Sequence, residues 1–279
     1  MSEEPAQESD LEKIEIHLLL EGIFRRYGYD FRNYSYASIR RRIWHRIHLE
    51  GLSNVSALQE RVMHHSEVFH RLLSDLVIPV TEMFRDPEIF LTFRNEVVPL
   101  LRGLPYIRIW HAGCSTGEEA HSMAILLHEE GLLDKTRIYA TDISENALQR
   151  AKDGIIPIDR MKLYTKSYQA AGGMQSFSDY YTSDDGIVML KPFLRTNMVF
   201  ARHNLVTDRS FNEFHVILCR NVMIYFNSQL RGQVHKLLHD SLAKEGFLIV
   251  GNKESISHTP LEDSYETMND QYRIFRKTR

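Results

Sequence analysis

The chain has 279 residues, of which 43% are hydrophobic and 25% are charged, and its formal net charge at pH 7 is −3. This length is sufficient for one large domain or two smaller ones, and the charge argues against general binding of nucleic acid or anionic membranes. No apolar stretch has membrane-spanning length, the first residues are acidic, and the two cysteines, Cys114 and Cys219, form no disulfide framework. We therefore expect a cytoplasmic protein with no direct membrane insertion.

The N-terminal third of the chain has a helical pattern. Residues 1–10 are polar and acidic, which predicts a disordered tail. Apolar residues then recur at helical spacing, with Gly28 and Gly51 ending successive segments and Ser66 expected as the N-cap of the fourth helix. We predict a small helical domain over residues 11–90.

From about residue 91, strand-like runs alternate with helical segments. The expected strands are residues 107–112, 137–141, 215–219, 246–250 and 272–276. One expected helix begins after Gly117, and two others cover residues 145–152 and about 228–242. This alternation predicts crossover units and a mainly parallel sheet in an α/β domain over residues 91–279.

One stretch, about residues 155–200, interrupts this alternation. It begins turn-rich and continues with three short strand-like pieces at residues 187–190, 193–196 and 198–201. We expect a small inserted subdomain at about residues 160–200.

The loop after the first strand of this domain has the sequence Gly113-Cys-Ser-Thr-Gly117, followed by Glu118 and Glu119. Ligands of parallel sheets bind beyond the carboxyl ends of the strands, and glycines let the backbone approach a ligand closely. A carboxylate at the helix start suits the helix dipole but repels a phosphate. S-adenosylmethionine carries an ammonium and a sulfonium instead, and Asp142 at the end of the next strand can accept hydrogen bonds from ribose hydroxyls. These residues together favour S-adenosylmethionine.

Two other interpretations of these residues remain open at this point. The acidic residues are also compatible with stabilising helix starts, without any ligand. A nicotinamide-dependent oxidoreductase uses a similar sheet, but the glycine pattern is not a full G-x-G-x-x-G and the two glutamates disfavour a pyrophosphate.

Several runs resemble the chemotaxis receptor methyltransferases, the CheR family. They are IPVTEMFRDP (78–87), IRIWHAGCSTGEEAHSMA (107–124), IYATDISENAL (138–148), HNL (203–205) and CRNVMIYF (219–226). The resemblance is collinear from about residue 12 to the C-terminus. It implies an N-terminal helical domain, then a Rossmann-like class I methyltransferase domain that depends on S-adenosylmethionine and contains a small inserted antiparallel β subdomain.

The resemblance also implies an activity and site residues. The activity is transfer of a methyl group to glutamate side chains on the cytoplasmic methylation helices of chemoreceptors, with S-adenosylhomocysteine as the second product, by an enzyme recruited to receptor arrays. The implied cofactor-binding residues are Thr81, Arg85, Gly113, Glu118, Asp142, Asn204, Leu205, Arg220 and Asn221. Arg85 and Tyr225 are the implied catalytic residues. A non-catalytic adaptor that binds the same cofactor is the alternative function.

The chain departs from the family pattern at two places. Pro79 replaces an asparagine that many relatives carry two residues before the threonine of the T-x-x-x-R segment, so an amide contact is not expected there. Relatives that dock on a C-terminal receptor pentapeptide have a glycine-rich insertion in the β subdomain, whereas here only TSDDG separates Tyr181 from residues 187–190. We expect an enzyme that does not depend on such a tether.

The second predicted helix is basic on one side. Its apolar face comprises Tyr36, Ile39, Ile43 and Ile47. Arg41, Arg42 and His45 lie on the opposite face, with Arg46 at the boundary. Such a pattern is typical of a solvated helix face. Because the family's second helix faces acidic receptor helices, the resemblance favours receptor binding by these four residues.

Two further ligand classes are disfavoured by the sequence. No aromatic residues are interleaved with the basic ones in the pattern of a nucleic-acid reader, so we expect no nucleic-acid partner. Cys114, Cys219 and His111 lack the close paired spacing of zinc ligands, so we expect no metal site.

Overall fold

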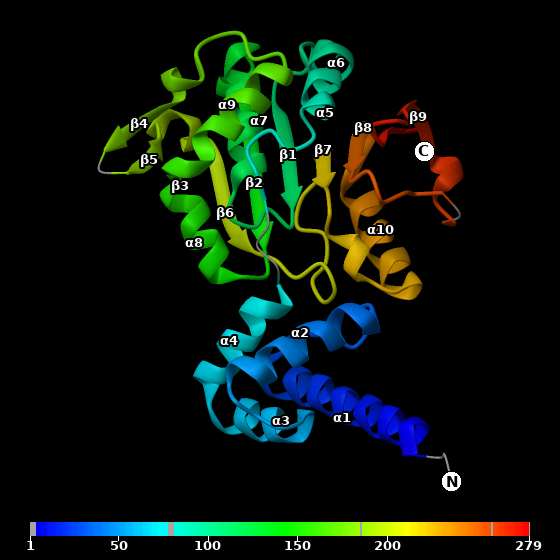
Figure 1. Cartoon of the computed structure of the whole chain (residues 1–279). Helices are drawn as coiled ribbons and strands as arrows, with labels where there is room; N and C mark the ends of the chain where they lie inside the picture. The colour runs from blue at the N-terminus through cyan, green and yellow to red at the C-terminus, as the bar shows by residue number, and fades with distance from the viewer. Residues whose placement is uncertain (1–3, 78–80, 185, 258, 279) are drawn as a thin grey trace. The chain divides into compact units, whose positions relative to one another are not determined.

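The computed structural model describes residues 4–77, 81–184, 186–257 and 259–278. The chain forms two compact units (Figure 1). One unit comprises Met1–Ile78 and Tyr225–Arg231, and the other comprises Pro79–Ile224 and Gly232–Arg279. The boundary therefore lies before the predicted position at residue 90. Ile89 and Phe90 follow it and are buried in the core of the second unit.

The first unit contains four helices. They are α1 (Glu4–Tyr27), α2 (Tyr36–Leu49), α3 (Val55–His64) and α4 (Ser66–Leu76). Gly28, in a left-handed conformation with φ +76°, ends α1, and the side chain of Asn54 accepts the N–H of Ala57 to cap α3. Ser66 is the first residue of α4 instead of its N-cap, which is His65.

The start of α1 differs from our prediction. A disordered tail was expected over residues 1–10, but α1 begins at Glu4. Residues 1–3 lie outside the described residues. Because Ile16, Leu19 and Ile23 anchor the helix in the core of this unit, the preceding turns continue a helix that is already formed.

A short segment from the C-terminal half of the chain completes the helical unit. Phe226 forms an antiparallel bridge with Tyr34, and its ring is buried against the Tyr34 ring, with centroids 4.9 Å apart. The N–H of Ser35 donates to the Tyr225 carbonyl at 2.7 Å, and that of Asn227 donates to the carbonyl of Asn33 at 2.9 Å.

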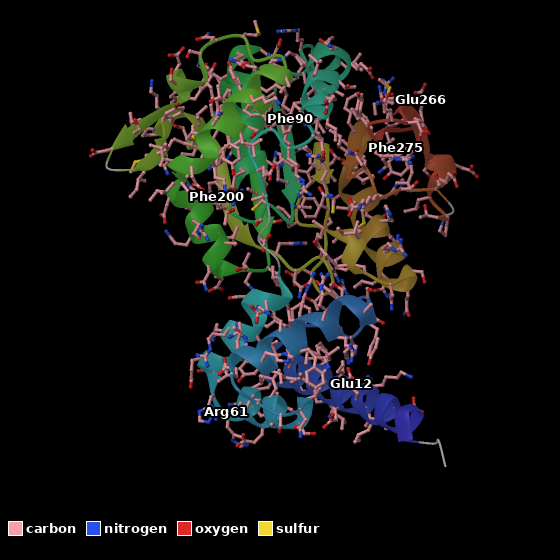
Figure 2. All side chains as sticks on the ribbon, in the orientation of Figure 1. Glu12, Arg61, Phe90, Phe200, Glu266 and Phe275 are labelled. Carbon is pink, nitrogen blue, oxygen red and sulfur yellow. The ribbon has the colours of Figure 1, made fainter. Side chains whose placement is uncertain are left out.

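The second unit is built on a seven-stranded sheet with the order β6-β2-β1-β7-β8-β10-β9. Its strands are β1 (Ile107–Ala112), β2 (Thr136–Asp142), β6 (Met198–Arg202), β7 (Phe214–Cys219), β8 (Leu242–Val250), β9 (Tyr265–Asn269) and β10 (Ile274–Lys277). The first five strands in this order pair in parallel, whereas β10 pairs antiparallel with β8 and β9. Figure 2 shows Phe275 of β10, which is buried, and Glu266 of the edge strand β9, which is exposed. The predicted Rossmann-like sheet is confirmed.

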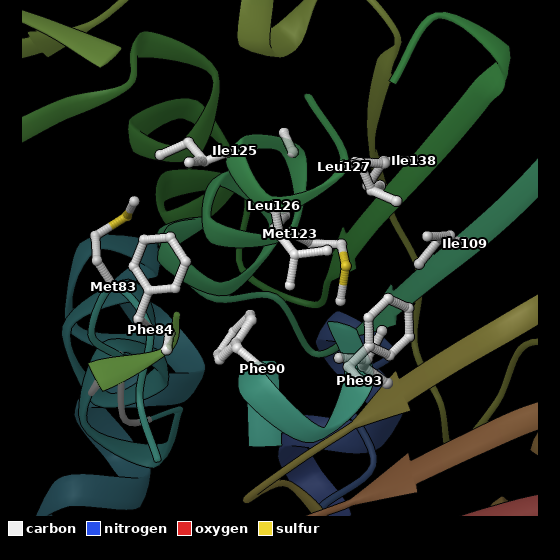
Figure 3. Close-up of a cluster of buried hydrophobic side chains, with 14 of the residues drawn as sticks. Met83, Phe84, Phe90, Phe93, Ile109, Met123, Ile125, Leu126, Leu127 and Ile138 are labelled. Carbon is white, nitrogen blue, oxygen red and sulfur yellow. The ribbon is translucent and has the colours of Figure 1, made fainter. Parts of the chain in front are cut away.

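Helices flank this sheet in the second unit (Figure 1). They include α5 (Pro87–Thr92), a π-helical turn (Phe93–Val97), α6 (Val98–Leu101), α7 (Glu118–Glu129), α8 (Glu145–Asp153), α9 (Met161–Ala170) and α10 (Ser228–Ser241). Figure 3 shows the core that α7 forms with the sheet and with α5: Met123 and Leu127 lie near Ile109 of β1 and Ile138 of β2. This burial fixes the start of α7 at the end of β1.

The inserted subdomain is smaller and lies earlier in the chain than predicted. Its three-stranded antiparallel sheet has the order β3-β5-β4, with β3 (Ile155–Pro157), β4 (Tyr181–Asp184) and β5 (Ile187–Leu190). The predicted strand at residues 193–196 is a 3-10 helix (Pro192–Arg195). The predicted strand at residues 198–201 is β6, which belongs to the large sheet because it pairs with β2.

No helix within the part of the chain that the structure describes is long and apolar enough to cross a membrane.

Candidate functional site

The loop that follows β1 is tied to the end of β2. The backbone N–H groups of Gly113 and Cys114 both donate to the Thr141 carbonyl, at 2.8 and 2.9 Å. The N–H of Ser115 donates to Oδ2 of Asp142 at 2.8 Å. These bonds place the glycine loop beside the Asp142 carboxylate, at the carboxyl ends of two parallel strands, where such sheets bind ligands.

Gly113 is required by both conformation and space. Its φ of +79° lies in the left-handed region that favours glycine. A Cβ atom at this position would lie 2.6 Å from Cγ2 of Val222, which is too close for two carbon atoms. The glycine loop therefore packs directly against the loop that follows β7.

Asp142 is buried but keeps acceptor capacity. Its Oδ1 accepts the N–H of Ser144 at 2.9 Å, while Oδ2 accepts that of Ser115. Burial raises the pKa of the carboxyl group. An ionised carboxylate has about four acceptor positions, so each oxygen can accept a further donor, such as a ligand hydroxyl.

Glu118 is the first residue of α7 and follows Gly117, which has φ +89°. Oγ1 of Thr116 donates to Oε2 of Glu118 at 2.7 Å. Burial raises the pKa of the Glu118 carboxyl group, because its hydrogen-bond partner is a hydroxyl and not a cation. The side chain therefore provides an acidic group at the helix start that a cationic ligand would stabilise.

Glu119 belongs instead to a buried ionic network. One of its oxygens lies 2.9 Å from Nδ1 of His111, and the other accepts Nη1 of Arg220 at 2.8 Å. Nη2 of Arg220 lies 2.5 Å from Oδ2 of Asp86. Burial alone would raise the pKa of Glu119, but the hydrogen bond with His111 and the charge of Arg220 lower it to about 2. The charge of Glu119 is thus balanced within the protein, as is that of the predicted site residue Arg220.

The segment that contains Thr81 is hydrogen-bonded to α7 through the hydroxyl group of Ser122. The N–H of Phe84 donates to Oγ of Ser122 at 2.8 Å, and that hydroxyl donates to the Glu118 carbonyl at 2.7 Å. Thr81 itself is half-buried. These bonds connect the segment to the helix that begins at the glycine loop.

Arg85 lies between two residues with left-handed backbones, Phe84 with φ 51° and Asp86 with φ 54°. Such conformations cost energy in residues other than glycine and persist only when surrounding contacts hold them. Here the Phe84 ring is buried, Asp86 pairs with Arg220, and the Arg85 carbonyl accepts Nη2 of Arg220 at 3.3 Å. The backbone at Arg85 is therefore held on both sides.

The segment after β6 lies next to the end of β2. The N–H of His203 donates to the Asp142 carbonyl at 3.1 Å. Asn204 is buried, and its Oδ1 accepts the N–H of Val206 at 3.0 Å, while Leu205 is half-buried. The structure thus brings Asn204 and Leu205 to the same edge of the sheet as the glycine loop.

A residue that the sequence did not reveal, Glu254, holds the loop after β7. Its carboxylate accepts the backbone N–H groups of Asn221, Val222, Ile224 and Gly251. The only sign of this role in the sequence is that a carboxylate follows shortly after the predicted strand at residues 246–250. In the structure that strand pairs with β7. The Glu254 carboxylate thereby holds the backbone of Asn221 and of Val222, whose side chain packs against Gly113.

Tyr225 belongs to the other unit. Its carbonyl accepts the N–H of Ser35, and its ring lies under the guanidinium group of Arg42, with the central carbon 4.7 Å from the ring centroid. The structure therefore groups this predicted catalytic residue with the helical unit and not with the cofactor residues above.

Two of the four predicted receptor-binding residues do not lie on an exposed face of α2. Arg42 is 5% exposed and its Nη1 donates to the Leu76 carbonyl, while Arg46 is 8% exposed and its Nε lies 2.6 Å from Asp75. The helical wheel placed Arg42 opposite the apolar face, but α4 packs on that side of α2 and buries it. Arg41 and His45 are exposed, as expected.

Comparison with known proteins decides the family. The family model for the CheR methyltransferase SAM binding domain matches residues 79–273, and that for the CheR methyltransferase all-alpha domain matches residues 14–77. The chain belongs to the CheR methyltransferase family. The resemblance found in the sequence is confirmed, together with the division into a helical domain and an S-adenosylmethionine-binding domain.

Individual relatives agree with this assignment. The chain is 52% identical over 265 residues to a Pseudomonas putida protein named "Putative methyltransferase Cher3", covering 95% of this chain and 97% of the relative. It is 27% identical to a chemotaxis protein methyltransferase of Listeria innocua, covering 95% of this chain and 98% of the relative. A chemotaxis protein methyltransferase of Borreliella burgdorferi is 33% identical, with 63% of this chain and 64% of the relative covered.

The residues of this CheR protein fit S-adenosylmethionine and not a dinucleotide. Glu118 and Asp142 are the acidic groups at the glycine loop: Glu118 suits a cationic ligand, and Asp142 can accept hydrogen bonds from ligand hydroxyls. Oγ of Ser115 in the same loop is buried and has no hydrogen-bond partner among the described residues, which leaves a polar atom for a ligand to satisfy. The match to the family's SAM binding domain rejects the nicotinamide alternative.

The thiols of Cys114 and Cys219 are both buried, and burial raises the pKa of each. Within the described residues, no group of three or more histidine, cysteine, aspartate or glutamate side chains is arranged to hold a metal ion.

Proposed function

We propose that this CheR protein transfers a methyl group from S-adenosylmethionine to glutamate side chains on the cytoplasmic methylation helices of chemoreceptors, forming glutamate methyl esters. The family assignment supports methyl transfer from this cofactor. The names of the Listeria and Borreliella relatives place those proteins in chemotaxis, which supports a chemoreceptor as the acceptor. The observation that carries the proposal is the pair of acidic side chains, Glu118 and Asp142, at a glycine loop that belongs to this family's cofactor-binding domain.

The chemistry requires alignment more than acid–base catalysis. S-adenosylmethionine supplies a methyl group on a positively charged sulfur. A glutamate side chain has an ordinary pKa of about 4.3, so the acceptor is already ionised at neutral pH and needs no strong general base. The protein's task is to orient the acceptor carboxylate and remove water from it.

Several residues of the second unit are proposed to bind the cofactor. Asp142 is proposed to accept hydrogen bonds from the ribose hydroxyls, and Glu118 to stabilise the positive charge of the cofactor. Asn204 and Leu205 are proposed to contact the adenine, and Thr81 to contact the cofactor from the segment fastened to α7.

The acceptor side of the reaction is assigned to two other residues. Arg85 is proposed to steer the acceptor carboxylate, through a single or water-mediated contact that leaves the carboxylate nucleophilic. Tyr225 is proposed to orient that carboxylate by hydrogen bonding. Both roles follow the position of these residues in the family's motifs.

The exposed basic residues of α2, Arg41 and His45, are proposed to meet the acidic receptor helices and recruit the enzyme to receptor arrays. We further propose that no pentapeptide tether is needed. Asp184 of β4 pairs directly with Ile187 of β5, so only two residues connect these strands and no glycine-rich insertion extends the hairpin.

The proposal is tested by incubating the full chain with methyl-labelled S-adenosylmethionine and cytoplasmic receptor fragments that lack any C-terminal pentapeptide. We expect label on the fragments that alkali releases as methanol, and loss of label when the methylation-site glutamates are replaced by glutamine. Measured binding of S-adenosylhomocysteine, without label on any receptor fragment from the same organism, would favour the non-catalytic adaptor instead.

A further inference from the structure

The Glu254 carboxylate is buried and accepts four backbone N–H groups. Its Oε2 accepts the N–H groups of Gly251 at 2.7 Å and Asn221 at 2.8 Å, and its Oε1 accepts those of Val222 at 2.9 Å and Ile224 at 3.2 Å. The residue is only 5% exposed. An ionised carboxylate in such surroundings is costly unless its lone pairs are satisfied, and four N–H dipoles satisfy them here.

These bonds select an unusual conformation of the loop after β7. Asn221 has φ +59°, in the left-handed region that most residues with a side chain avoid and that asparagine tolerates better than most. The bonds from Asn221 and Val222 to Glu254 hold the backbone on either side of this residue.

Gly251 shows how closely the loop is fitted to the carboxylate. A Cβ atom there would lie 2.7 Å from Oε2 of Glu254 and 2.9 Å from the backbone nitrogen of Asn221. The end of β8, the carboxylate and the loop therefore pack as one unit with no room for an added methyl group.

The loop held in this way forms one side of the cofactor site. Its Val222 side chain packs where Gly113 lacks a Cβ atom, and Arg220, directly before it, pairs with Glu119 at the start of α7. A shift of the loop therefore moves both Asn221 and the partner surface of the glycine loop.

We propose that Glu254 is a positioning residue for the methyl donor: it does not touch the cofactor, but it holds Asn221 and Val222 in the conformation that binds it. This inference rests on the proposed function only in taking S-adenosylmethionine as the methyl donor and Asn221, which the family resemblance implies, as one of its contacts. Its measurement, binding of S-adenosylhomocysteine to the full chain, needs no receptor. Absence of receptor methylation would overturn the proposed acceptor and leave the inference intact.

The test compares Glu254→Gln with a matched variant of another buried carboxylate. Glutamine turns an NH₂ group toward one pair of loop N–H groups, so we expect affinity for S-adenosylhomocysteine to fall about tenfold by calorimetry. The control is Glu129→Gln, because Glu129 is also buried and accepts Tyr180 Oη and the N–H of Met174, both outside the cofactor site. We expect the control to lower the melting temperature while leaving the affinity within about twofold.

A purely structural role for Glu254 predicts a different outcome. In that case Glu254→Gln would lower the melting temperature as Glu129→Gln does and leave the affinity unchanged, which would overturn the inference. If Glu254→Gln does not fold, Gly251→Ala tests the same contact with the carboxylate retained. Its methyl group must push against Oε2 and the Asn221 nitrogen, and normal affinity in that folded variant would equally overturn the inference.

The route through Asn221 can be tested with a double variant. If Glu254 acts through this residue, Glu254→Gln should weaken binding much less in an Asn221→Ala background than in the wild type. Fully additive effects would show that the carboxylate acts by another route.

Discussion

At the residue scale, the two adjacent glutamates at the start of α7 have opposite electrostatic surroundings. Burial raises the pKa of Glu118, whereas His111 and Arg220 outweigh burial and lower that of Glu119 to about 2. Side chains one position apart on a helix point in different directions, so Glu119 reaches His111 of β1 and Arg220, just after β7, while Glu118 accepts the hydroxyl of Thr116. The same local sequence thus supplies one structural carboxylate and one that suits a cationic ligand.

This difference predicts opposite effects of two glutamine substitutions on stability. A lowered pKa in the folded state means that Glu119 stabilises the fold above its ordinary value of 4.5, and that this stabilisation is lost as the pH falls toward about 2. One pKa unit corresponds to about 1.4 kcal/mol, so the full effect is on the order of 3 kcal/mol. Glu119→Gln should therefore lower the free energy of unfolding in urea at pH 7, with the deficit shrinking below pH about 4.5.

Glu118→Gln provides the matched comparison. Because burial raises its pKa, the folded state holds the Glu118 proton more tightly than the unfolded state, and this contribution to stability is lost as the pH rises through the raised value. Glu118→Gln should accordingly stabilise the fold at pH 7. If the two variants show the same pH dependence of unfolding, the different surroundings assigned to the two glutamates are wrong.

At the scale of elements, helical and strand periodicity predicted the long, strongly patterned segments. The glycine loop, β1, β2, β7 and the helices after them were recognised because buried parallel strands are nearly continuous apolar runs. The edge strands β4 and β9 were missed, since exposed edges carry polar residues such as Thr182 and Glu266. The piece at residues 193–196 was assigned to a strand although Pro192 starts a helical turn there.

The prediction of site residues from the sequence is limited in a similar way, because contacts between distant parts of the chain are not visible in it. Motifs predicted site residues in contiguous loops, such as Gly113 and Asp142, because the loop and its strand are adjacent in sequence. Glu254 acts on a loop more than 30 residues earlier in the chain, and only the pairing of β7 with β8 brings it there. The burial of Arg42 likewise depends on where α4 packs, which a helical wheel cannot show.

The exposed side of α2 leads to a prediction about receptor methylation. Arg41→Glu should lower the rate of receptor methylation at low substrate concentration about tenfold, because steering by opposite charge accelerates encounter, and the loss should diminish in high salt. The control is Arg61→Glu, a charge reversal at an exposed arginine of α3 in the same unit (Figure 2). Equal losses in both variants would show that α2 has no specific role, and binding of S-adenosylhomocysteine should be normal in each.

At the scale of the whole molecule, the chain passes between the two units three times. The first division lies between Ile78 and Pro79, and the other two flank Tyr225–Arg231, which belongs to the helical unit. The sequence motif CRNVMIYF therefore spans both units: Arg220 pairs with Glu119 in the second unit, whereas Tyr225 and Phe226 contact Ser35 and Tyr34 of the helical unit. The N–H of Ile224 donates to Glu254 within the second unit, and the Tyr225 carbonyl accepts the N–H of Ser35 within the helical unit.

This division predicts that the helical unit depends on a residue about 150 positions after its last helix. Phe226→Ala removes a buried ring packed on Tyr34 and should destabilise α1–α4 by about 3 kcal/mol. Hydrogen exchange of the full chain should show faster exchange in these helices, while the seven-stranded sheet keeps its protection. Phe193→Ala is the control, since Phe193 is 37% exposed and lies in the other unit. Unchanged exchange in α1–α4 of Phe226→Ala would mean that the segment does not contribute to the stability of these helices. A loss of protection confined to α1–α4 would show that the segment is part of their packed structure.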